Sequence, residues 1–164
     1  MLVTKNKTLG FTLIEVLVVV AIIGIMSALT LASWAAGRTQ RDLDRSAREV
    51  AAVLRDAQNA ALSGRSANVN ENNCRFSVHV VNSDTYRLLH YFGSGCSSSG
   101  TLASYTLSRG VAFGSIGYEV SFAVPHGKFT GPASIVLTKG GSSVYICLSA
   151  AGRILENGTN SSCP

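Results

Sequence analysis

The chain opens with one long hydrophobic segment. From Phe11 to Ala36 it contains no Lys, Arg or Asp, and Glu15 is the only ionisable side chain. About 20 apolar residues are enough for a helix to cross a bilayer. A charged side chain inside such a helix costs about 2.5–3.5 kcal/mol on insertion scales, so it needs a partner or a function. Residues 11–36 are therefore predicted to form a transmembrane helix in which Glu15 has a functional role. The alternative is a plain anchor whose acid lies near the membrane interface.

The helical pattern continues beyond this segment. Apolar residues recur at spacings of three and four, which predicts a single apolar stripe on one helical face. Gly64 is a natural helix stop. Residues 37–64 are therefore predicted to be the amphipathic half of one helix running from Phe11 to Ser63. The stripe consists of Leu43, Ala47, Val50, Leu54, Ala57 and Ala61.

Charged residues of both signs lie off this stripe. Opposite charges three or four residues apart, such as Asp44 and Arg48, give an exposed helix modest support. We favour a solvated face crossed by ion pairs. The alternative is a basic stripe that contacts partners or lipid head groups. Its residues would be Arg38, Arg41, Arg45 and Arg48.

The second half of the chain consists of short β-type runs separated by Gly, Ser and Asn. Two hairpins are predicted, one pairing Phe76–Val81 with Thr85–Phe92 and one pairing Ser134–Thr138 with Ser143–Ser149. Gly93–Gly100 is predicted to be a flexible loop. Strands after one amphipathic helix predict an α+β fold, with an antiparallel sheet packed on the helix stripe. The remaining predicted strands are 103–107, 111–113 and 118–124.

Composition and motifs favour a structural role over an enzymatic one. The 164 residues leave room for one long helix and one domain of about 100 residues. The net charge of +5 falls to +3 without Lys5 and Lys7, with 12 basic against 9 acidic side chains, and so mild a charge does not by itself indicate nucleic-acid binding. No serine lies in a nucleophile-elbow pattern, and no glycine-rich phosphate loop joins a strand to a helix. We expect no catalytic activity and no cofactor.

The start of the chain resembles the type IV pilin-like family, which includes type IV pilins and the pseudopilins of type II secretion. Lys5 and Lys7 lead into Gly10, and Phe11-Thr-Leu-Ile-Glu15-Val then opens the apolar helix. The resemblance implies that a prepilin peptidase removes residues 1–10 by cutting after Gly10, and that it methylates Phe11. It also implies assembly with other pilins or pseudopilins.

The physical chemistry of this resemblance explains the position of Glu15. Cleavage leaves the amino group of Phe11 as a positive charge inside hydrocarbon. Glu15 of one subunit can pair with the amine of a neighbour as helices stack in a filament, and in a medium of low dielectric constant that pair is strong. The leader lysines favour a cytoplasmic amino terminus. We therefore expect a single-pass inner-membrane protein with a periplasmic head of residues 65–164, which then moves into a filament.

The carboxy-terminal half is similar to the FimT/GspH branch of that family. The similarity lies in Phe122-Ala-Val-Pro-His-Gly127, Ile135-Val-Leu137 and Val144-Tyr-Ile-Cys-Leu-Ser-Ala-Ala-Gly-Arg-Ile154. This implies a minor pilin or pseudopilin at the filament tip or in the initiation complex.

A second hypothesis is a DNA-binding minor pilin for natural transformation, because some FimT members bind DNA through a Gly-Arg-X-Arg motif. Here Gly152-Arg153-Ile154 is followed by Leu155 in place of the second arginine. Lys128, Lys139 and Arg153 are the candidate DNA contacts. The alternative for Arg153, which we favour, is that it ties the last strand to the sheet.

The four cysteines are expected to form disulfides, since all lie in the part expected to face the periplasm. Three connectivities are possible. We prefer Cys74–Cys96 and Cys147–Cys163 because each closes a local loop. Zinc bound with help from His79 or His90 is the alternative, but no Cys-x-x-Cys spacing supports a metal site. The polar tail between Cys147 and Cys163 is predicted to be disordered unless that bridge fastens it.

Overall fold

The computed structural model describes residues 11–64, 73–149, 152–157 and 163 of the chain, leaving aside the side chains of residues 29–36 and 157. The chain divides into two compact units, residues 1–38 and 39–164. The main element is helix α1 (Leu13–Leu62), which has 50 residues. Both of its ends lie within two residues of the predicted limits, so the prediction of one long helix is confirmed.

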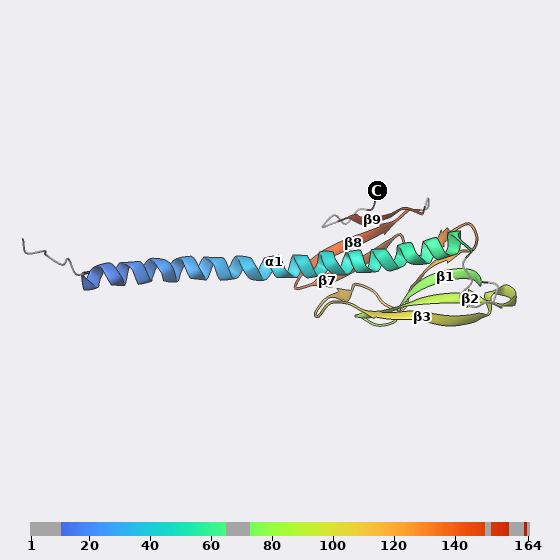
Figure 1. Ribbon diagram of the computed structural model, residues 1–164, viewed down its shortest axis with the longest axis horizontal. Helices are drawn as coiled ribbons and strands as arrows, with labels where there is room; N and C mark the ends of the chain where they lie inside the picture. The colour runs from blue at the N-terminus through green and yellow to red at the C-terminus, as the bar shows by residue number, and fades with distance from the viewer. Residues whose placement is uncertain (1–10, 65–72, 150–151, 158–162, 164) are drawn as a thin grey trace, which may run out of the picture. The chain divides into compact units, whose positions relative to one another are not determined.

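The predicted apolar stripe of α1 is the side that faces the core. Each of its six residues is at most 1% exposed. The arginines predicted to lie off the stripe are exposed, including Arg41, Arg48 and Arg55. A period of 3.6 residues places these two sets on different faces of a helix. Figure 1 shows β8 and β9 on one side of this half of α1 and β1, β2 and β3 on the other.

The strands form two antiparallel sheets. The first has five strands in the order β3-β2-β1-β5-β6, and the second has four in the order β4-β7-β8-β9. The bounds in the first sheet are β1 (Asn73–Val80), β2 (Thr85–Phe92), β3 (Ser98–Thr106), β5 (Glu119–Ala123) and β6 (Lys128–Thr130). Those in the second are β4 (Ala112–Phe113), β7 (Ser134–Lys139), β8 (Ser142–Leu148) and β9 (Ile154–Asn157).

One core joins α1 to both sheets. Leu54 of the helix, Phe122 of the first sheet and Ile146 of the second are all at most 1% exposed and belong to a single cluster of buried apolar residues. Burying one side chain of this size stabilises a fold by about 1.5–3 kcal/mol. The predicted α+β fold, with its helix packed on antiparallel strands, is therefore confirmed.

The β elements depart from the predictions in three places. The predicted loop Gly93–Gly100 contains a short 3-10 helix, Ser94–Cys96, and its last residues already belong to β3. Both β6 and β9 were missed, because strands of three and four residues are too short to show an alternating pattern. The tail was predicted to be disordered unless a Cys147–Cys163 bridge fastened it; that bridge is present, and residues 154–157 form β9, which pairs with β8.

Two glycines are required by close packing. A Cβ on Gly100 of β3 would clash with the imidazole ring of His90, which is buried beside it. Gly127 has a φ of +61°, and a Cβ there would lie 2.8 Å from Cδ2 of Leu62 at the end of α1. A positive φ costs glycine little and other residues more. The turn before β6 therefore fits against the helix end only as glycine.

None of the described helical residues form a segment that is both long enough and apolar enough to span a bilayer.

Candidate functional site

The first turn of α1 carries the residues that the sequence singled out. The side chain of Thr12 caps the helix: its Oγ1 accepts a hydrogen bond from the backbone N–H of Glu15 at 3.3 Å. The carbonyl of Thr12 accepts from the same N–H at 3.1 Å. An N-cap residue fixes where a helix begins. Glu15 is therefore held in the first helical turn, four residues after Phe11.

The spacing Thr12-x-x-Glu15 is a capping-box pattern that the sequence analysis overlooked. In a full capping box the glutamate side chain would also bond the backbone N–H of the cap residue. Only the threonine half is present here. Among the residues that the structure describes, the carboxylate of Glu15 has no hydrogen bond or ion pair. That carboxylate is thus available to a group from outside the described chain.

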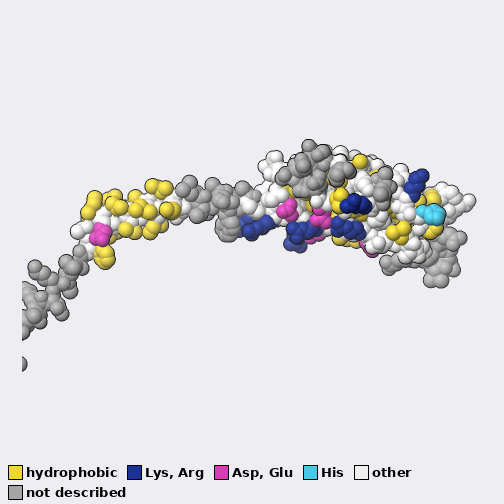
Figure 2. Space-filling model, turned by 90° about the horizontal axis from the view of Figure 1, so that it is seen from above, with side chains coloured by type: hydrophobic (Ala, Val, Ile, Leu, Met, Phe, Trp, Pro, Cys, Tyr) yellow, Lys and Arg dark blue, Asp and Glu magenta, His cyan; other side chains and the backbone are white. Residues whose placement is uncertain are grey.

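The surroundings of Glu15 are apolar and exposed. Phe11 is 84% exposed, Leu13 is 83% and Ile14 is 66%, and every residue from 11 to 28 is exposed. Figure 2 shows this part of the helix covered by hydrophobic side chains, with one acidic group among them. Soluble monomers rarely expose continuous apolar surface of this extent, and where it occurs it marks a protein or membrane contact. Residues 11–28 are therefore a candidate contact surface, and the acid within it, Glu15, has no partner among the described residues.

The two disulfides are the pairings preferred from the sequence. Cys74 of β1 is bonded to Cys96, and Cys147 of β8 is bonded to Cys163, with Cα–Cα separations of 6.0 and 5.4 Å. All four cysteines are thereby used, so the thiolates that the zinc alternative needed are absent. Among the described residues no group of acids, histidines and cysteines is arranged to hold a metal.

Helix side chains hold the strand that ends the second sheet. The Arg55 guanidinium donates to the carbonyl of Ile154 at 3.3 Å and pairs with Glu156 at 3.2 Å. The Gln58 amide donates to the carbonyl of Gly152 at 2.7 Å. These bonds fasten β9 to α1 independently of the disulfide.

The three candidate DNA contacts lie apart from one another. Nζ of Lys139 donates to Asp42 at 2.6 Å and to the Arg109 carbonyl at 2.8 Å, so its charge is already paired. Arg153 lies near a different part of the helix, because the carbonyl of its neighbour Gly152 accepts a hydrogen bond from the Gln58 amide. Positions 42 and 58 are about 24 Å apart along a helix. Lys128 is exposed on β6, an edge strand of the five-stranded sheet. Among the described residues, Arg153 bonds Ser149 through its backbone: its carbonyl accepts from the Ser149 N–H, and its N–H donates to the Ser149 hydroxyl. That Arg153 ties its strand to the sheet stays a prediction.

The charged face of α1 agrees with the favoured interpretation of mixed ion pairs. Arg45 pairs with Glu49 at 2.9 Å, and both side chains are well exposed. That pair raises the pKa of Arg45, first through the hydrogen bond to Glu49. Asp44 accepts a hydrogen bond from Gln40 at 2.9 Å. Figure 2 shows basic and acidic side chains intermixed here. Pairs of this kind contribute little to stability.

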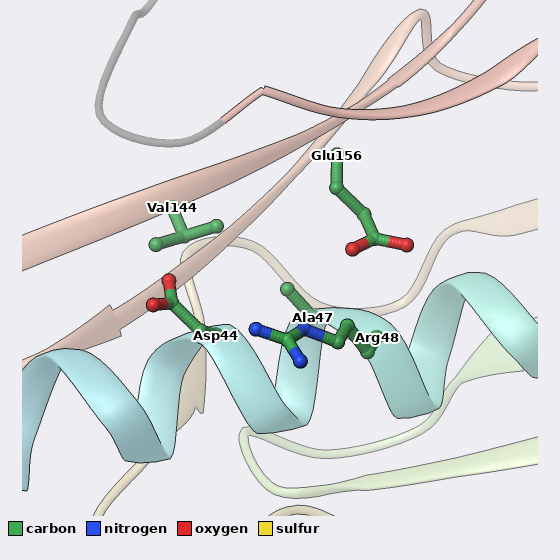
Figure 3. Close-up of a pocket in the computed structure, with 5 residues that line it drawn as sticks. All are labelled: Asp44, Ala47, Arg48, Val144 and Glu156. Atoms are coloured by element: carbon green, nitrogen blue, oxygen red, sulfur yellow. The ribbon is translucent and has the colours of Figure 1, made fainter.

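A small hollow lies between α1 and the second sheet (Figure 3). Its volume is about 180 Å³. Sites for small molecules usually measure about 300–1,000 Å³, so it is too small for a drug-sized ligand. Ala47 and Val144 supply apolar lining, and in Figure 3 the Arg48 guanidinium lies between the carboxylates of Asp44 and Glu156. The lining residues are Asp44, Ala47, Arg48, Val144 and Glu156.

A polar cluster on the outer face of the five-stranded sheet was not predicted. The Arg75 guanidinium carbon lies 3.8 Å from the centre of the Tyr91 ring, and the Tyr91 hydroxyl donates to Glu119 at 3.0 Å. Burial, followed by this hydrogen bond, raises the pKa of Tyr91. Ser77, between them on β1, is fully buried, and its hydroxyl has no partner in the described structure. No nucleophile and base are paired here, so the cluster offers no catalytic arrangement.

Comparison with known families supports an assignment for the amino-terminal unit. Residues 5–31 match the model of the prokaryotic N-terminal methylation motif. Searches of curated proteins and of solved structures give no match. The motif indicates a subunit like those of type IV pili and their pseudopilin relatives, and it implies assembly with other pilins and processing by a prepilin peptidase. The α+β fold is consistent with a pilin-like chain.

Proposed function

We propose that this chain is a minor pilin or pseudopilin of the FimT/GspH type, cut after Gly10, methylated at Phe11 and assembled through α1 into a filament. The observation that carries the proposal is the methylation motif at residues 5–31, which contains the capped start of α1. In such a filament the free carboxylate of Glu15 pairs with the Phe11 amine of a neighbouring subunit. The chain acts at the filament tip or in the initiation complex.

Before assembly, the apolar part of α1 holds the chain in the bacterial inner membrane, with residues 65–164 in the periplasm. The exposure of residues 11–28 supports this step, because that surface is stable only in lipid or against other helices. The two disulfides support it as well, since disulfides persist in oxidising compartments such as the periplasm.

The FimT/GspH assignment gains support from where its residues lie. Phe122, Ile135, Leu137 and Ile146 are all at most 1% exposed, in strands of both sheets. The resemblance therefore involves the residues that build the core of the head. A resemblance limited to surface residues would be weaker support for a shared fold.

Shearing filaments from the cell surface tests the proposed function. The chain is expected to co-sediment with sheared pili if it serves a type IV pilus. If it serves a secretion pseudopilus, deleting its gene should stop protein secretion and leave the surface pili intact. A deletion strain with normal pili and normal secretion would contradict the proposal.

A further inference from the structure

The five-stranded sheet ends in a long edge strand that contains no charged residue and no proline. Strand β3 has nine residues and, among the described strands, pairs only with β2. Natural proteins protect such edges by keeping them short or by adding charged residues or proline. The sequence of β3, Ser-Ser-Gly-Thr-Leu-Ala-Ser-Tyr-Thr, contains none of these. Figure 1 shows β3 at the outer margin of its sheet.

The other edge strands of the described chain are protected. Strand β6 has three residues, including the exposed Lys128. Strand β4 has only two residues. Strand β9 has four, including Glu156, and is bonded to α1. Among the described edge strands, β3 is therefore the one that is both long and without charged residues.

The hydrogen-bond pattern identifies the groups that β3 offers. The backbone N–H of Leu107 donates to Asp84 at 2.8 Å, and the register continues with Thr106 opposite Thr85 and Ser104 opposite Arg87. In an antiparallel ladder every second residue bonds the neighbouring strand. Leu107 and Tyr105 thus bond β2, while Ser104 and Thr106 direct their N–H and C=O groups away from it.

The side chains of this edge suit strand pairing. Ser104 and Thr106 are exposed, because Ala103 and Tyr105 face the core. Small hydroxyl side chains on neighbouring strands form favourable cross-strand pairs. Leu102, at a register shift in the pairing with β2, is 44% exposed and adds apolar surface at the middle of the strand.

We infer that the edge of β3 receives an extended, uncharged strand from a different subunit of the same filament. Backbone groups arranged along an open edge are what a strand-adding partner recognises. This inference rests on the proposed function. A second copy of this chain is the wrong occupant, because pairing β3 with itself about a two-fold axis is antiparallel. Helix residues 39–62, in the same unit as β3, would then run in opposite directions in one polar filament.

Amide hydrogen exchange, resolved by residue, tests this inference on the full chain. The two samples are wild-type protein in detergent and wild-type protein in sheared filaments. Exchange at Ser104 and Thr106 should be at least about tenfold slower in filaments. Exchange at Ala103 and Tyr105 should be slow in both samples, since their amides already bond β2. General burial of the head would not produce this alternation.

The variant Ser104→Pro removes one outward N–H without touching the bonds to β2, and proline is tolerated at such edge positions. In filaments of this variant the slow amide exchange of Thr106 should be lost, or the variant chain should be missing from the filament fraction. The control Ser104→Ala should behave as wild type. Equal exchange of Ser104 and Thr106 in both wild-type samples would overturn the inference while leaving the proposed function standing. Absence of the wild-type chain from every filament would overturn both.

Discussion

Replacing Glu15 by alanine is expected to remove the chain from filaments while leaving it in the membrane. The carboxylate of Glu15 has no partner among the described residues, although Thr12 holds it in place at the helix start. In the proposed filament it is expected to neutralise the amine of Phe11 from a neighbouring subunit. Leaving a charge unpaired in an apolar core costs about 2.5 kcal/mol or more. That corresponds to a loss of incorporation of well over tenfold.

The measurement is the amount of chain in sheared filaments relative to the amount in the membrane fraction. Glu15→Gln should be nearly as defective, because an amide keeps the shape and removes the charge. Glu49→Ala is the matched control: it removes another glutamate of α1, one whose ion pair with Arg45 is well exposed. Normal incorporation of the Glu15→Ala chain would show that the carboxylate has no role in assembly.

Replacing Cys163 by serine is expected to lower the free energy of unfolding and to loosen the end of the chain. The bridge to Cys147 closes a loop with a sequence separation of 16 residues. A loop of that size is stabilised by about 3 kcal/mol in the chain-entropy model. Strand β9 would then depend on its pairing with β8 and on the bonds from Arg55 and Gln58.

Trypsin provides the local readout, because Arg153 is exposed at the start of that strand. Cleavage after Arg153 should be faster in Cys163→Ser, while helix α1 and the β1–β2 hairpin stay resistant. Cys96→Ser is the matched control, since its bridge joins β1 to the short 3-10 helix. That variant should be destabilised without faster cleavage at Arg153. Identical cleavage rates in Cys163→Ser and wild type would refute the anchoring role of the bridge.

Long periodic patterns in this sequence predicted structure well. The stripe from Leu43 to Ala61 identified the buried face of α1, because a long helix repeats its pattern many times. Shorter elements carried too little pattern. Strand β9 (Ile154–Asn157) has only four residues, which is too few to show an alternating pattern. It forms because β8 and Arg55 supply its hydrogen-bond partners. The composition of Ser98–Gly100 indicated a loop, yet edge pairing with β2 determines its conformation.

In the candidate sites, too, local patterns could be predicted from the sequence and contacts between distant residues could not. Phe11 and Glu15 could be found from the sequence because their spacing is local. The cluster of Arg75, Tyr91 and Glu119 could not, because it depends on the register of three strands. The pairing of Lys139 with Asp42 joins residues 97 positions apart and carries no sequence signal.

The mass of the intact mature protein tests the central claim most directly. Protein purified from its own host is expected to have the mass of residues 11–164 with one added methyl group and two disulfides. Fragmentation should place the methyl group on the amino nitrogen of Phe11, and a strain without the prepilin peptidase should yield the unmethylated full chain. A mature protein that retains Lys5 and Lys7 in a host with an active peptidase would contradict the account.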